Sequence, residues 1–193
     1  MRRAEVRRRA GLLLAAFVLL SHRSSAQSRP WPVAVEALDL ATLAGDWYEV
    51  AAYGFGAHRR CVSDTRFEWV VRTSRTVDVT SHCSTVSGDQ VRSGRIRAGS
   101  AMTQGRLTAR FGSRILAWLP AVWDDHWILA LGEHQQWMLV GDRDRRRMSV
   151  LSRWVALDEA SLARAIGAAR AQGFDVARLA PVPHPHGARA EER

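Results

Sequence analysis

The sequence predicts an all-β fold, an eight-stranded up-and-down antiparallel β-barrel with a C-terminal α-helix packed outside. Short runs of alternating or apolar residues recur between residues 47 and 153 and are separated by turn residues. One amphipathic helical segment follows the last run. Gly45 and Trp47 open the first run, and Arg153 ends the last. A permissive glycine, an indole and a cation able to stack on it are suited to plug the closed end of a small barrel.

The strands are expected in chain order after a short helical turn at 39–44. Their ranges are 47–55, 62–71, 76–84, 91–98, 105–111, 126–131, 137–141 and 148–153. In the 105–111 run, Leu107, Ala109 and Phe111 alternate with polar residues, so one face of this strand is expected in solvent. The last three runs are apolar almost throughout, which indicates that both of their faces are covered.

The cover for the late strands is a predicted helix that begins after Asp158, a typical N-cap residue, and ends at Gly173. Its apolar stripe consists of Leu162, Ala165, Ile166 and Ala169. Short connections favour a meander whose closure removes exposed sheet edges. A barrel of eight strands has room for side chains and one small ligand.

Four further segments extend the Gly45 and Trp47 motif into a family resemblance. They are 127–131, 137–142, 150–153 and 173–176, so that the similarity covers roughly 36–182. This set resembles the lipocalins, and in particular the bacterial outer-membrane lipocalins and apolipoprotein D. The resemblance implies a barrel that binds a small lipophile, with a role in lipid transport or maintenance of the bacterial envelope.

Residues 1–26 have the features of a secretory signal, with a basic start, an apolar segment too short to span a bilayer, and small residues before the cleavage site. Cleavage after Ala26 would leave a lipocalin domain at 27–183 and a flexible tail at 184–193. A basic helix that stays attached is the alternative. Many relatives are lipid-anchored through a cysteine near this site, and none is present here. We therefore expect a soluble periplasmic protein, exported by either the Sec or the Tat route.

Charge gives no indication of a nucleic-acid partner. The whole chain has 28 basic and 19 acidic residues. The predicted signal holds six of the arginines and Glu5, which leaves 22 basic and 18 acidic residues in the mature chain. A net charge this small does not provide the electrostatic footprint that nucleic-acid binding requires.

Cys61 and Cys83 both lie in the exported part, where an oxidising compartment favours a disulfide. Two free buried thiols are the alternative. With a hairpin turn at 72–75, counting along the ladder sets Cys83 opposite Asp64. A bulge or an irregular strand start must therefore absorb the offset between the two cysteines.

Alternate loops of an up-and-down barrel lie at the same end, so the loops opposite Trp47 and Arg153 form its open end. Two of these loops are basic: one carries His58, Arg59 and Arg60, and the other carries Arg143, Arg145, Arg146 and Arg147. We expect Arg59, Arg60 and Arg145 to contact the acidic head group of a ligand. A solvated basic turn is the alternative.

The connection at 112–125 belongs to the same end and is unusually apolar. It contains Ile115, Leu116, Trp118, Leu119, Val122 and Trp123. Apolar residues in a rim loop indicate a lid, a peripheral membrane contact or a protein interface, including a homodimer. The alternative is that these side chains fold down as an upper part of the core.

Strand alternation also predicts which side chains point into the barrel. Glu49 is expected on the inward face together with Trp47. The residues expected to contact a bound lipophile are Tyr53, Phe67, Trp69, Val79, Leu107, Phe111, Trp127 and Leu129. An error of one residue in the register would reverse a face.

The sequence does not favour catalysis or a cofactor. No nucleophile stands beside a base and an orienting group, and no residues have metal-ligand spacing. The histidines His58, His82, His126 and His134 are spread over four elements and are expected at the surface or rim. Haem binding through a cavity histidine is not favoured, because His82 and His126 fall opposite the apolar faces. Some lipocalins isomerise a substrate with a cavity thiol. This reaction is excluded here if Cys61 and Cys83 form a disulfide.

Three functions remain, in order of preference. The first is a periplasmic carrier that holds a fatty acid or lysophospholipid, with the acyl chain in the barrel. The second is a structural or partner-binding barrel with a filled interior that uses the apolar 112–125 connection. The third is an enzyme acting on small lipophilic substrates.

Overall fold

The computed structural model describes residues 30–36, 38–54, 60–99, 105–112 and 114–185. Residues Trp31–Arg193 cluster as one compact unit. The predicted signal at 1–26, His58, Arg59 and residues 186–193 lie outside the described residues. Within the described part, no helix is long and apolar enough to cross a membrane.

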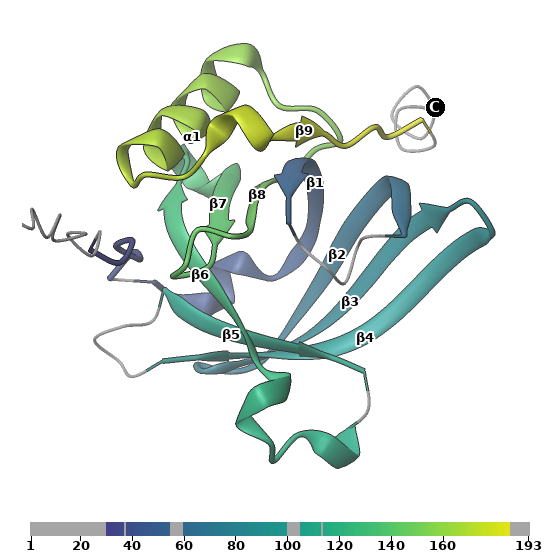
Figure 1. Cartoon of the computed structure of the whole chain (residues 1–193). Coiled ribbons are helices and arrows are strands. Elements are labelled where there is room, and N and C mark those ends of the chain that lie inside the picture. The colour runs from purple at the N-terminus through teal and green to yellow at the C-terminus, as the bar shows by residue number, and fades with distance from the viewer. Residues whose placement is uncertain (1–29, 37, 55–59, 100–104, 113, 186–193) are drawn as a thin grey trace, which may run out of the picture. The chain divides into compact units, whose positions relative to one another are not determined.

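Eight consecutive antiparallel strands form a closed barrel (Figure 1). They are β1 (Gly45–Tyr53), β2 (Cys61–Thr73), β3 (Thr76–Thr85), β4 (Gly88–Ala98), β5 (Arg106–Phe111), β6 (Asp124–Leu131), β7 (Trp137–Gly141) and β8 (Met148–Ser152). Each strand pairs with the next along the chain, and β1 pairs with both β2 and β8, which closes the barrel. The predicted fold class is confirmed. A short ninth strand, β9 (Ala180–Pro181), was not expected.

Short 3₁₀-helices precede, connect or follow the barrel strands. They are η1 (Leu40–Leu43), η4 (Arg114–Leu116), η5 (Pro120–Val122), η6 (Glu133–Gln135) and η7 (Val176–Arg178). The first of them confirms the helical turn predicted at 39–44. Its N-cap is Asp39, whose carboxylate accepts a hydrogen bond from the backbone N–H of Ala41 at 2.9 Å.

Helix α1 (Glu159–Ala171) packs on the outside of β6 and β7, as predicted (Figure 1). The carboxylate of Asp158 caps it by accepting a hydrogen bond from the N–H of Ser161 at 2.9 Å. After the helix, the ring of Phe174 lies against Gly141 on β7. A side chain cannot fit there, because a Cβ on Gly141 would come within 2.7 Å of that ring. Glycine thus allows the segment after α1 to lie close to the sheet.

The buried residues form two clusters, one inside the barrel and one between the late strands and α1. The inner cluster includes Trp47, Trp69, Val77, Ile96, Leu107, Ile128 and Met138. The outer cluster includes Tyr53, Trp127, Leu129, Trp137, Leu139, Ala165, Ala169 and Phe174. Strands β6, β7 and β8 contribute to both clusters, which explains their continuous apolar sequences.

Two irregularities in the ladder decide which cluster a residue joins. In the pairing of β1 with β8, Glu49 is opposite Leu151 and Ala51 is opposite Val150, so Val50 is an extra residue. In the pairing of β6 with β7, Leu129 is skipped in the same way. Each β-bulge shifts the alternation by one position, so side chains beyond it point to the opposite face.

The closed end contains the predicted plug. The guanidinium of Arg153, just after β8, covers the indole of Trp47, which is completely buried. The indole N–H of Trp47 donates to the carbonyl oxygen of Leu43 at 2.8 Å, which ties η1 to β1. Gly45 has a φ of +97°, and a Cβ there would lie 3.4 Å from an Arg153 nitrogen. This position therefore favours glycine.

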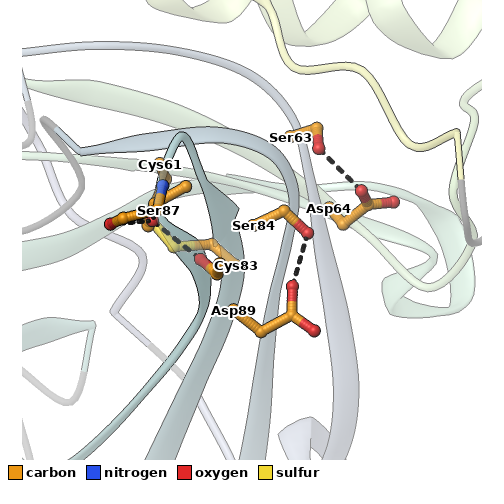
Figure 2. The surroundings of a disulfide bond; sticks show 9 residues. Cys61, Ser63, Asp64, Cys83, Ser84, Ser87 and Asp89 are labelled. Atoms are coloured by element: carbon orange, nitrogen blue, oxygen red, sulfur yellow. Dashed lines mark hydrogen bonds between the residues drawn. A yellow bond between two sulfur atoms is a disulfide. The ribbon is translucent and has the colours of Figure 1, made fainter.

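A disulfide joins Cys61 at the start of β2 to Cys83 on β3, with a Cα–Cα distance of 5.6 Å (Figure 2). The structure also contains the predicted irregularity, because the register shifts twice between Cys61 and Arg66. Within this stretch Asp64 has a φ of +54°, and its backbone N–H donates to the carbonyl oxygen of Pro183 at 2.8 Å. The bulge thus brings the cysteines together and also contacts the C-terminal segment.

The segment around β9 lies beside β1 (Figure 1). Ala180 and Pro181 pair with Ala52 and Ala51, and the N–H of Val182 donates to the carbonyl oxygen of Val50 at 3.0 Å. Strands β1 and β2 pair only at the closed end, from Gly45 to Tyr48. Residues 180–185, named here the C-terminal strap, therefore bond to β1 and β2 beyond the point where these two strands stop pairing.

Candidate functional site

The barrel encloses a small cavity beyond the plug. The volume open to the centre of a water-sized sphere is about 40 Å³. Its lining is Glu49, Phe67, Trp69, Val79, Ile96, Ala109, Phe111, His126, Val140, Ser149 and Leu151. Most of these side chains are apolar. Phe67 and Trp69 come from β2, and Val79 comes from the neighbouring strand β3. This inner cavity is suited to an apolar group accompanied by a small polar one.

Glu49 is the acidic residue of the inner cavity and is only 3% exposed. One carboxylate oxygen, Oε1, accepts a hydrogen bond from Ser149 Oγ at 2.7 Å. Burial raises the pKa of Glu49 to about 7, and the hydrogen bond from Ser149 lowers it by a smaller amount. At neutral pH the carboxyl is therefore partly protonated, so it can both donate and accept hydrogen bonds.

Trp69 supplies the second polar feature of the inner cavity. The side chain is 5% exposed, and its indole N–H is buried without a hydrogen-bond partner in the structure. Buried donors are nearly always paired in folded proteins, so this indole N–H is an exception. The Trp69 side chain forms part of the cavity wall, and its indole nitrogen is covered by surrounding protein atoms.

His126, near the start of β6, lines the inner cavity and is half-buried, so it faces the interior, contrary to the predicted orientation away from the apolar face. Burial lowers its pKa, so the imidazole is neutral over most of the physiological range. The argument against a cavity histidine is therefore wrong for His126. In the described part of the chain, no three His, Cys, Asp or Glu side chains come together in a way that could hold a metal ion.

A second, larger hollow opens beside the first and is named here the mouth hollow. The volume open to a water-sized sphere is about 380 Å³. Its lining is Glu49, Ala52, Tyr53, Gly54, Cys61, Val62, Thr65, Pro181, Val182 and Pro183. Glu49 borders both spaces, and the C-terminal strap forms one side of the mouth hollow. A long molecule could therefore occupy both spaces and pass Glu49.

The structure places only part of the predicted ligand-contact set around these spaces. Phe67, Trp69, Val79 and Phe111 line the inner cavity. Leu107 points inward but lies in the inner cluster, outside the cavity lining. Tyr53 borders the mouth hollow.

The predicted inward orientation is wrong for Tyr53, Trp127 and Leu129, which belong to the outer cluster. The bulge at Val50 turns Tyr53 outward, where the Arg178 guanidinium carbon lies 4.5 Å from the centroid of its ring. Trp127 packs edge-on against Trp31, with 6.3 Å between the ring centroids. Alternation along a strand that is apolar on both faces gave no signal to distinguish these orientations.

The basic residues expected at the mouth have structural partners instead. Arg145 Nε donates to the carbonyl oxygen of Gln172 at the end of α1, at 2.6 Å. Arg147 forms ion pairs with Asp124 and Asp142 at 3.0 and 3.3 Å. Arg60 is exposed at the start of β2, and Arg59 lies outside the described residues. The loop between β7 and β8 therefore uses its arginines to hold itself to α1 and β6.

The apolar connection between β5 and β6 is not folded down as an upper core. Ile115, Leu116 and Trp118 are 82%, 47% and 77% exposed. Trp123 is held against the outer face of the sheet, with the guanidinium carbons of Arg97 and Arg110 at 4.1 and 5.5 Å from its ring centroid. The exposed side chains thus form an outward-facing apolar patch.

Sequence reasoning missed two polar residues of the inner cavity, Ser149 and His126, and did not assign a ligand contact to Glu49. Glu49 had a visible signal, since an acidic residue on the inward face of a strand needs a partner. Ser149 lies in an almost continuously apolar strand, where a single hydroxyl has no distinctive pattern. His126 required knowledge of the β5–β6 register.

The geometry described above agrees with a comparison with known families. Residues 38–184 match the family model described as a lipocalin-like domain. The chain belongs to the lipocalin family. Lipocalins are in general binding and transport proteins for small hydrophobic molecules, and the closed barrel with its apolar cavity suits that general role.

Individual relatives of this lipocalin are distant. Temperature-induced lipocalin-1 of Arabidopsis thaliana is 22% identical over 150 residues, which cover 77% of this chain and 81% of the relative. Insecticyanin from the tobacco hornworm Manduca sexta is 15% identical, with a TM-score of 0.63 over 81% of this chain and 86% of that one. Lobster apocrustacyanin A1 is 13% identical, with a TM-score of 0.59 over 82% and 93%. At these identities the solved structures support the fold alone.

Proposed function

We propose that this lipocalin is an exported carrier that holds one monoacyl lipid, a fatty acid or a lysophospholipid, in its barrel. The observation that carries the proposal is the pair of spaces that meet at Glu49. The inner cavity offers the apolar walls that an acyl chain needs, and each buried CH₂ contributes about 0.8 kcal/mol without directional contacts. The mouth hollow has both polar and apolar walls, as a head group at the surface needs.

Export and location in the bacterial periplasm are part of the same proposal. The signal features of residues 1–26 support export, and the disulfide between Cys61 and Cys83 supports an oxidising compartment. Similarity to the bacterial outer-membrane and apolipoprotein D group supports a role in transport or maintenance of envelope lipids. The proposed domain is 27–183 with a tail at 184–193, of which His184 bonds to the carbonyl oxygen of Glu49 as part of the C-terminal strap.

A second candidate function is a partner-binding barrel, with a second copy of this chain as one candidate partner. The exposed apolar patch of Ile115, Leu116 and Trp118 favours it, because large apolar side chains exposed together mark interaction surfaces. This function would leave the interior without a ligand. It is therefore separable from the carrier function by a binding measurement.

Lipid-stripped protein can be tested by native mass spectrometry and by titration with oleate and lysophosphatidylcholine. The expected result is one lipid per chain and saturable binding. Filling the cavity by Ala109→Phe should abolish binding, since Ala109 is buried in the cavity wall. The matched control is Thr108→Phe, on the opposite face of the same strand. Saturable binding by neither lipid would leave the partner-binding function ahead.

A further inference from the structure

The connection between β5 and β6 holds the apolar patch of Ile115, Leu116 and Trp118 in solvent. Single exposed apolar residues are ordinary on a protein surface, whereas three within four residues mark an interaction surface. None of the three lines the inner cavity or the mouth hollow. A ligand in the barrel therefore gives no reason for their exposure.

The apolar patch is held outward by a folded turn. The backbone N–H of Leu119 donates to the carbonyl oxygen of Leu116 at 3.0 Å. The indole N–H of Trp123 donates to the carbonyl oxygen of Ala117, the residue before Trp118, also at 3.0 Å. The connection is thus folded back on Trp123, and it projects from the end of β5 with the patch exposed (Figure 1).

Trp123 is in turn anchored to the sheet by two arginines, one on each neighbouring strand. The guanidinium carbons of Arg97 on β4 and Arg110 on β5 lie 4.1 and 5.5 Å from the centroid of its ring. Arg110 is 6% exposed, and its Nη1 donates to the carbonyl oxygen of Gly112 at 2.9 Å. The base of the connection is therefore surrounded by positive charge.

A basic hollow lies beside this base. The volume open to a water-sized sphere is about 300 Å³. Of the described residues that line it, Arg72, Arg95 and Arg110 are basic and Asp78 is acidic, which leaves an excess of two positive charges. Gly112 lines the hollow as well, so the hollow adjoins the start of the connection that carries the apolar patch.

An apolar patch next to a basic hollow matches the surface of an anionic phospholipid bilayer. Apolar side chains enter the interfacial region of a bilayer, and basic groups are attracted to its anionic head groups. A protein partner fits this surface less well. The three side chains expose an area on the order of a few hundred Å², below the roughly 800 Å² that each partner of a stable complex buries.

We propose that the apolar patch and the basic hollow together form a docking surface for an anionic phospholipid membrane. The patch enters the interfacial region, and the hollow faces the phosphate groups. This inference goes beyond the carrier function, since it assigns a surface outside both cavities and requires no ligand in the barrel.

Sedimentation with vesicles tests the proposal. Lipid-stripped protein is mixed with vesicles of phosphatidylcholine, or of phosphatidylcholine and phosphatidylglycerol in equal amounts. The protein should sediment with the mixed vesicles and bind pure phosphatidylcholine at least about fivefold more weakly, the factor for one basic residue at an anionic surface. A carrier that only extracts a lipid would stay in the supernatant. Equal binding to both vesicle types, or binding to neither, would overturn the docking surface.

Variants assign the binding to the two parts of the surface. Trp118→Ala should weaken binding to mixed vesicles on the order of tenfold, whereas Trp154→Ala, an exposed tryptophan just after β8, should have no effect. Arg72→Gln should weaken it about fivefold, and Arg170→Gln on α1, which changes the net charge equally, should weaken it less. All four side chains are exposed, so these changes should leave the fold intact. Equal losses within either pair would contradict the proposal.

A second copy of this chain is the competing occupant of the apolar patch. Sedimentation velocity of the wild type and of Trp118→Ala measures the oligomeric state. A dimer that this substitution converts to a monomer, in a protein that does not bind vesicles, would reassign the patch to an interface between copies. The lipid titrations that test the carrier function are separate measurements, so either proposal can fail while the other stands.

Discussion

The guanidinium carbon of Arg153 lies 3.8 Å from the centroid of the Trp47 indole ring. The same guanidinium donates hydrogen bonds to the carbonyl oxygens of Thr42, Ala44 and Asp46, at 2.8 to 3.1 Å. One side chain therefore joins the end of β8 to η1 and to the start of β1. Since β1 and β8 are neighbours in the closed barrel, this residue fixes the seam at the closed end.

Truncating the plug should destabilise the barrel in a graded way. Trp47→Ala removes the largest fully buried side chain and should lower the free energy of unfolding by about 3 to 5 kcal/mol. Arg153→Ala should cost less, and Arg153→Lys should recover little, because an ammonium cannot reproduce the planar fork that reaches three carbonyls. Urea unfolding monitored by far-UV circular dichroism measures all three. Wild-type midpoints for both alanine variants would contradict the plug.

Glu49 should make stability depend on pH. Its pKa is raised from 4.5 to about 7 in the folded state, so the folded protein holds a proton that the unfolded chain releases. This contribution is present below about pH 4.5 and is lost as pH rises through about 7, a change of about 3 kcal/mol. The pKa of His126 is lowered, which acts in the opposite direction below 6.5.

The comparison that isolates Glu49 is between the wild type and Glu49→Gln. The stability of the wild type relative to this variant should fall between about pH 5 and pH 8. Thermal unfolding in matched buffers measures the difference, in which the contribution of His126 cancels to a first approximation. A difference that stays constant over this range would show that Glu49 titrates near its ordinary pKa.

The disulfide should be complete in the exported protein. Thiol titration of the denatured, unreduced protein should detect no free sulfhydryl, in agreement with the bond between Cys61 and Cys83. Replacing both cysteines by alanine should lower stability by about 3 kcal/mol, the value for a loop of this length. Two free thiols per chain would instead reopen the possibility of a reactive cavity cysteine.

The two clusters predict different consequences for similar substitutions. Phe111→Leu alters the wall of the inner cavity and should weaken lipid binding severalfold. Leu129→Ala lies in the outer cluster, so it should lower stability by about 2 to 5 kcal/mol and leave lipid affinity unchanged in the folded protein. Parallel titration and urea unfolding separate these effects. A loss of affinity in Leu129→Ala alone would place the binding site under α1.

Two kinds of feature could be predicted from the sequence. Some depend on local composition, and others depend on a distinctive pair of residues that are far apart in the chain. Turn residues between apolar runs predicted eight strands, and Asp158 and Gly173 marked the limits of α1. Trp47 and Arg153 predicted the plug because few other pairs of residues suit that contact. The irregularity near Cys61 could be inferred by counting, because the disulfide and the regular ladder were incompatible.

The orientations beyond the bulges could not be predicted in the same way. Neither Val50 nor Leu129 has a sequence feature such as glycine that marks an extra residue in a ladder. Consequently Tyr53 was assigned to the wrong face. Trp127 and His126 precede the bulge at Leu129, and their faces depended on the register between β5 and β6. Arg145 was assigned to a ligand by its loop position, whereas its partner is a helix carbonyl 27 residues away in the chain.

The C-terminal strap is the last part of the described chain to be synthesised. His184 donates a hydrogen bond to the carbonyl oxygen of Glu49 at 2.9 Å, and its ring packs edge-on against Tyr48. All eight barrel strands precede this segment in the sequence, so a chain made from its N-terminus has every strand available before the strap can dock. Until then, the side of β1 near Glu49 is an uncovered strand edge. A chain that ends before residue 180 would leave this edge of β1 without its hydrogen-bond partners.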